Sequence, residues 1–219
     1  MVGGWQNPDY EKLVGLRPDL VLADKGQAQF VEEKCKKLGL HVMVVADEKT
    51  ADVYTAITAV GQATGHEAEA ARLLKETRDR LQRVSQRTAS LPKVRVVLIV
   101  DRTPGTLRDL YTATAGSYLA ELVDLAGGTV AVPADKLGYA KLSKEDLLAA
   151  NPDVVLDFTH GATGRFAGNP MDAWKEMPEL KAVRTHRVYA VNEEYVPHAS
   201  QRMVLTAELF ARLIHPEAK

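Results

Sequence analysis

The side chains best suited to contact a ligand gather in two segments, each of which follows a run of apolar residues. One segment follows the run 94–100 and the other, which is rich in glycine, follows the run 153–157. The residues concerned are Arg102, Arg108, Tyr111, His160 and Arg165. Because parallel sheets bind ligands at the carboxyl ends of their strands, we expect these side chains to reach one opening. Taken singly, each arginine also fits a solvated loop charge.

Histidine and cysteine, the usual ligands of transition metals, form no metal-site pattern. His160 follows a strand and is the better placed for ligand contact. His198 stands where a helix begins, which favours a cap or surface role over an axial bond to iron or cobalt. No two histidines stand four apart around a glutamate. Cys35 is the only cysteine, which excludes a disulfide framework and a cysteine-based metal site.

Motifs of catalysis are also missing from the sequence. There is no Gly-x-x-x-x-Gly-Lys stretch, and Gly161, Gly164 and Gly168 do not keep dinucleotide-binding spacing. Gly116-Ser117 lacks the frame of a nucleophile elbow. We therefore expect a binding protein that is not an enzyme and has no resident cofactor.

The composition is that of a soluble globular protein. The 28 basic and 29 acidic side chains among 219 residues give a formal net charge of −1, which does not favour a nucleic acid or an anionic membrane as partner. No apolar run approaches the roughly 20 residues that a membrane helix requires. From the sequence as it stands we expect no export leader before Val2.

The elements that must position these residues alternate between buried strands and helices. The expected strands cover 19–23, 41–45, 94–100, 153–157 and 187–191. The expected helices cover 27–38, 50–63, 117–125, 143–150 and 200–214, and a further short helix follows Asn7 as its N-cap. Apolar runs bounded by polar residues are typical of strands buried on both faces. The class is therefore α/β with parallel sheets.

A long polar helix is predicted from Thr64 to about Ser90. Thr64 and Glu67 have the spacing of a capping box, and a narrow apolar stripe runs along a surface that is otherwise charged. About 24 residues would span some ~36 Å, the breadth of a small domain. Such a helix fits a strut between two lobes or an ordinary surface helix.

An internal repeat on the two sides of this helix favours the strut. Residues 10–22 and 144–156 share a glutamate, a leucine two residues on, a proline seven on, an aspartate eight on and a closing Val-Leu. In each copy a predicted helix is ended by a proline and is followed by a predicted buried strand. The repeat suggests two similar α/β lobes with a ligand cleft between them.

The segments VGGW, NPDYEKLVGLRPDLVLA, GLHV, LAGG and LSKEDLLAANPDVVL together resemble the class III solute-binding proteins of ABC importers. These proteins capture cobalamin, iron-siderophores or haem outside the cytoplasmic membrane. The cobalamin binders are the most similar, through VGG before the first repeat and NEEYVPHASQR near the end. The resemblance implies two Rossmann-like lobes, 1–63 and 91–219, joined by one rigid helix, 64–90, so that closure is a modest tilt.

The resemblance also implies roles for individual residues. In the family one exposed glutamate in each lobe docks into arginines of the membrane permease, and the matching residues are Glu11 and Glu145. Taken singly, each glutamate also fits a favourable charge at a helix N-terminus. For the cleft, the resemblance places aromatic side chains at Trp5 and Tyr195, whose rings would cover a flat corrin or porphyrin.

The chain departs from the family pattern at its start. Family members carry a strand and a helix before the VGG segment, and this chain has neither. We therefore expect an incomplete first lobe, exposed sheet edges, and a homodimer or swapped assembly that covers them. A non-binding remnant and a chelatase-like enzyme of the same architecture stay open as alternatives. By resemblance the protein is periplasmic, or extracellular and membrane-associated.

Overall fold

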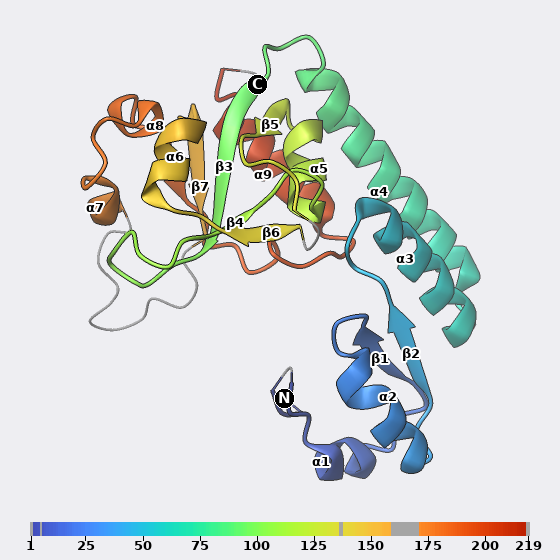
Figure 1. Ribbon diagram of the computed structural model, residues 1–219. Helices are drawn as coiled ribbons and strands as arrows, with labels where there is room; N and C mark the ends of the chain where they lie inside the picture. Colours follow the sequence, from blue (N-terminus) through green and yellow to red (C-terminus); the bar gives the residue numbers. More distant parts are fainter. Residues whose placement is uncertain (1, 5, 136–137, 159–170, 218–219) are drawn as a thin grey trace.

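The computed structural model describes residues 2–4, 6–135, 138–158 and 171–217 (Figure 1). The α/β class is confirmed. A larger unit is built on a six-stranded sheet and a smaller one on a two-stranded sheet, and the helices α3 and α4 lie beside both (Figure 1).

The larger sheet has the strand order β6-β4-β3-β7-β8, with β5 also paired to β3. Its strands are β3 Val94–Asp101, β4 Tyr111–Ala113, β5 Gly128–Val130, β6 Tyr139–Lys141, β7 Val154–Asp157 and β8 Val188–Ala190. The expected parallel pairing holds between β3 and β5, β3 and β7, and β7 and β8, but β4 pairs antiparallel with both β3 and β6. Three residues of β4 pair with β3 across a bulge between Ile99 and Asp101, and so short a strand shows no apolar run.

Helices cover both faces of this sheet. On one face lie α5 Tyr118–Leu125 and α9 Met203–Ile214, and on the other lie α6 Lys144–Ala150, α7 Met171–Trp174 and α8 Lys181–Arg184. Strand β3 supplies both cores, because Val96 and Leu98 point to the first face while Val97 and Ile99 point to the second. Fully burying each such side chain stabilises the fold by about 1.5–3 kcal/mol.

The long helix differs from the prediction at its start. Thr64 is the last residue of α3 (Thr50–Thr64), and its hydroxyl donates to the carbonyl of Val60. Gly65 ends α3 in the left-handed conformation, and α4 (Glu67–Thr88) begins after His66. The capping box at Thr64 was therefore wrong.

The two helices form a hairpin whose packing depends on Gly61. A Cβ at Gly61 would lie 2.4 Å from the Cβ of Ala70, so only glycine allows this approach. Further along, Arg78 covers the ring of Tyr54. The second half of α4 packs on α9 and α5, where Thr88 donates to the carbonyl of Leu125. The lobe boundaries 1–63 and 91–219 stay predictions.

The smaller unit consists of α1 Tyr10–Gly15, β1 Val21–Asp24, α2 Ala28–Lys37 and β2 Val42–Val45. Strands β1 and β2 are parallel, as expected, around a small core of Ala23, Val31 and Cys35. The expectation that 19–23 is buried on both faces was wrong, because Leu22 is 50% exposed toward α3 and α4. Among the described residues neither outer edge of this two-stranded sheet is paired, and a second copy there stays a prediction.

The repeated segments adopt matching backbone conformations. Asp9, rather than the expected Asn7, caps α1 by accepting from the N–H of Lys12, and Ser143 caps α6 by accepting from the N–H of Asp146. Before the repeated prolines, Arg17 and Asn151 both have positive φ, 48° and 37°. The repeat in the amino-acid sequence is therefore also a repeat in backbone structure.

Candidate ligand-binding cleft

A cleft of about 1060 Å³ lies between the smaller unit, the α3–α4 hairpin and three loops of the larger unit. From the larger unit, residues 116–118, 135, 138–139 and 197–201 line the cleft, together with residues 45–49 from the end of β2 onward. Its size slightly exceeds the range of about 300–1,000 Å³ that ligand pockets usually occupy.

The lining of the cleft combines apolar side chains with five carboxylates. The apolar wall is formed by Leu22, Ile57, Val60 and Leu73 from β1, α3 and α4. The carboxylates that line the cleft are Asp24, Asp47, Glu48, Glu69 and Asp135. No arginine is among the described lining residues.

The one lysine of the described lining is held by the larger unit. Lys49 Nζ donates to the carbonyl of Gly116 and lies 3.6 Å from Glu121 Oε1. The neighbouring Thr50 donates to Glu121 Oε2 through its N–H (2.8 Å) and its hydroxyl (2.7 Å). Glu121 of α5 thus fixes the start of α3, and the ammonium charge of Lys49 is matched by a carboxylate.

Asp47 is a carboxylate of the lining that has several acidic neighbours. Desolvation raises the pKa of its carboxyl, and the nearby charges of Asp24, Glu48 and Asp52 raise it further. Ionised Asp47 therefore lowers the stability of the folded protein at neutral pH. Since the folded pKa lies above the unfolded one, the stability that this group contributes is present at low pH and is lost as the pH rises through the folded pKa.

We expect Asp47→Asn to raise the melting temperature at pH 7. The gain should be no more than about 2–4 °C, the shift that 1 kcal/mol produces in a chain of this size, because interactions between exposed charges are weak. The gain should disappear below about pH 4, where the aspartate of the parent protein is protonated too. Differential scanning fluorimetry across this pH range checks it, and a gain that persists in acid would contradict the charge explanation.

Two tyrosines and a histidine bring ring faces to the cleft. Tyr118 and Tyr139 line it from the larger unit, and His198 lines it from the segment before α9. The ring of Tyr139 stacks on that of Tyr111 at 6.2 Å. The Tyr118 hydroxyl donates to the carbonyl of His198 at 3.4 Å, and burial raises the pKa of that phenol. The lining therefore holds aromatic rings as well as carboxylates.

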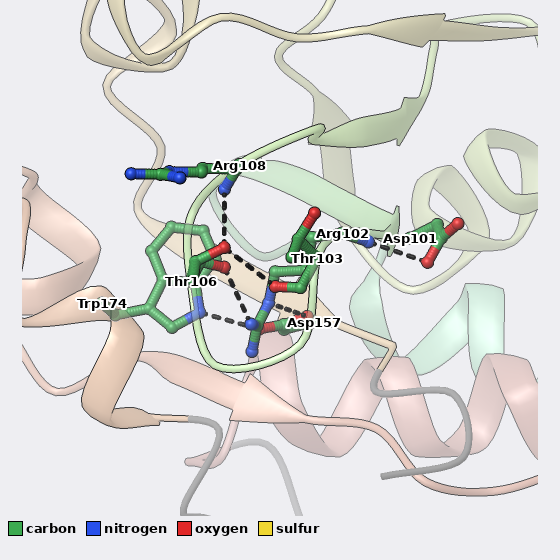
Figure 2. A network of polar contacts seen from close by, with 7 residues as sticks. All are labelled: Asp101, Arg102, Thr103, Thr106, Arg108, Asp157 and Trp174. Atoms are coloured by element: carbon green, nitrogen blue, oxygen red, sulfur yellow. Dashed lines mark hydrogen bonds and ion pairs between the residues drawn. The ribbon is translucent and has the colours of Figure 1, made fainter. Parts of the chain in front are cut away.

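Arg102, which the sequence predicts to contact the ligand, is engaged in a buried ion pair (Figure 2). Its Nε and Nη2 contact the carboxylate of Asp157 at 3.0 Å, and its Nη1 donates to the carbonyl of Thr106. The indole N–H of Trp174 donates to the same carboxylate at 2.8 Å. Burial raises the pKa of Asp157, while Trp174 and Arg102 oppose that rise.

This network ties the loop 102–106 to the end of β7 and to α7 (Figure 2). Arg102 is 8% exposed and is not in the described lining of the cleft. Its predicted ligand contact stays a prediction.

The other predicted site residues are dispersed. Arg108 is exposed, and its guanidinium extends away from the network around Arg102 (Figure 2). Tyr111 lies in β4 rather than in a loop and reaches the cleft only through its stacking on Tyr139. Tyr195 packs against the core beside α9.

Trp5, His160 and Arg165 lie outside the described residues. Sequence reasoning missed the segment 46–49, although it follows the carboxyl end of β2 just as the chosen loops follow β3 and β7. The same rule, applied to β2, would have found it. Tyr118 and Tyr139 carry no such signal.

Glu11 and Glu145 occupy equivalent positions on the two units. Each is exposed in the first turn of its helix, one residue after Tyr10 or Lys144. Across the described ranges, no helix has the length and apolar character to cross a membrane, and no His, Cys, Asp and Glu side chains gather as a metal site.

The sequence matches the family model described as periplasmic binding protein over residues 1–195. The uncharacterized ABC transporter substrate-binding lipoprotein YvrC of Bacillus subtilis is 28% identical, over 98% of this chain and 67% of its own length. The chain spans about two thirds of the length of the curated relatives it matches.

Solved structures share the fold. A periplasmic haem-binding protein from Pseudomonas aeruginosa has a TM-score of 0.84 at 19% identity, covering 100% of this chain and 79% of its own. The periplasmic vitamin B12 binding protein BtuF of Vibrio cholerae has a TM-score of 0.78 at 22% identity, covering 97% and 81%.

Proposed function

Because this chain belongs to the periplasmic binding protein family, we propose that it captures cobalamin or a related corrinoid in the cleft and delivers it to an ABC importer. The family and the relative in Bacillus subtilis are substrate-binding proteins rather than enzymes, in agreement with the expectation from sequence. We further propose that it works in the periplasm or at the outer surface of the membrane, where its permease partner would meet it.

The observation that carries the corrinoid proposal is the charge of the cleft. Five carboxylates and no arginine are found among its described lining residues. A corrin bears neutral amide side chains, whose N–H groups donate to such oxygens. Haem bears two carboxylates, which the same oxygens would repel. The apolar wall and the rings of Tyr118 and Tyr139 suit the flat face that both macrocycles share.

Haem or a ferric siderophore is the second candidate. It is favoured by Tyr118, Tyr139 and His198, since phenolate and imidazole are axial ligands of iron. The raised pKa of Tyr118 weakens the phenolate argument, because a neutral phenol is a poor ligand.

Titration with aquocobalamin, haemin and a ferric siderophore, followed by absorbance, tests the proposal. We expect aquocobalamin to bind with a Kd below about 100 μM, which corresponds to about 5.5 kcal/mol, and more tightly than the other two. Asp47→Asn with Glu48→Gln should then strengthen haemin binding, by about 2–5-fold for each charge removed, without strengthening aquocobalamin binding. If haemin binds more tightly to the parent protein, the corrinoid assignment is wrong; if nothing binds, the binding function is wrong.

A further inference from the structure

A second groove lies on the helical surface where α4 and α9 run side by side. It has a volume of about 520 Å³ and is lined by Arg80, Arg83, Val84, Gln86, Arg87, Glu208 and Arg212. Three of these arginines come from one face of α4, at spacings of three and four residues. The fourth, Arg212, comes from the last turn of α9.

The charges in this groove are not balanced. Glu208, the only carboxylate of the described lining, is held by Arg80, whose Nε and Nη2 lie 3.2 and 2.9 Å from its oxygens. Arg83, Arg87 and Arg212 are exposed and have no hydrogen-bond or ion-pair partner among the described residues. The groove therefore carries an excess of three positive charges in a chain whose net charge is −1.

The sequence of α4 concentrates this charge at one end. Its acidic residues end at Asp79, and Lys75 pairs with that aspartate. A basic side chain near a helix C-terminus also stabilises the helix dipole, which would account for Arg87 or Arg212 alone. The dipole does not account for Arg83, or for two helices that direct their cations into one groove.

We propose that this groove binds a phosphate group. A guanidinium group presents planar pairs of N–H donors that match the oxygens of a phosphate. The guanidinium groups of Arg83, Arg87 and Arg212 are not paired with a carboxylate among the described residues. The phosphate can belong to an anionic phospholipid at a membrane surface or to a free anion. The proposal is independent of the cleft and of the ligand bound there.

Flotation with phospholipid vesicles and calorimetric titration with inorganic phosphate test it. With a lipid source, the protein binds phosphatidylglycerol vesicles and not phosphatidylcholine vesicles. We expect that binding to weaken about 100-fold in the triple variant Arg83→Gln, Arg87→Gln and Arg212→Gln. The estimate multiplies a loss of about 5-fold for each basic residue that is removed from a negatively charged surface. With a free anion as source, inorganic phosphate binds directly and the same variant loses that binding.

A matched control removes the same charge elsewhere. Lys36→Gln, Arg72→Gln and Lys141→Gln change three exposed cations on α2, the first half of α4 and β6. We expect this control to weaken binding by less than about 5-fold. The Arg80–Glu208 pair is left intact in both variants, and their melting temperatures report whether the fold is kept. An equal loss in both variants, or no binding of either probe by the parent protein, overturns the proposal.

Discussion

Asp157→Ala is expected to destabilise the protein by about 3–5 kcal/mol, because it leaves the buried guanidinium of Arg102 without a counter-charge. The side chains of the pair are 4% and 1% exposed, so water cannot replace the carboxylate. The same change removes the acceptor of the Trp174 N–H. The melting temperature should fall by about 6–20 °C, as measured by circular dichroism.

Asp124→Ala is the matched control for this variant. It removes the same chemical group from an ion pair with Lys93 whose side chains are 73% and 52% exposed. Exposed pairs of this kind contribute about 0–1 kcal/mol, so the melting temperature should change little. The structural role of the buried pair would be refuted by a loss in Asp157→Ala no larger than that in the control.

Replacing both Glu11 and Glu145 by alanine is expected to stop delivery while leaving capture intact. Both carboxylates are exposed, lie outside the described lining of the cleft, and stand at equivalent positions of the two repeated segments. If each glutamate docks on an arginine of the permease, its removal leaves that arginine desolvated and unpaired. The loss should weaken docking by about 2–5 kcal/mol. Uptake of labelled ligand into proteoliposomes should fall at least about 30-fold, with ligand affinity unchanged.

Glu32→Ala with Glu179→Ala is the control for docking. These glutamates are exposed, one in each unit, and no ion pair holds either of them among the described residues. The control should transport like the parent protein. Docking through Glu11 and Glu145 is ruled out if the two double variants transport equally, or if the first loses affinity and uptake to the same degree.

Features that depend on neighbouring residues can be predicted from the amino-acid sequence. Ser143 and Asp146 form the capping box of α6, Gly39 has the positive φ that ends α2, and the apolar run at 94–100 forms β3. Each is decided within a few residues by hydrogen bonds or by hydrophobic pattern, so it is visible in the chain alone. The repeated segments were visible for the same reason.

Features that depend on contacts between separate segments cannot be predicted from local patterns and emerge only in the folded chain. The start of α4 at Glu67 follows from the close approach of Gly61 to Ala70, and this approach requires the turn at Gly65. Arg102 is buried because Asp157, 55 residues away, pairs with it in the core. The cleft likewise joins Asp47, Tyr118 and His198 from three separate segments. Burial and charge at such positions are set by which segments pack together, and a local pattern carries no record of that.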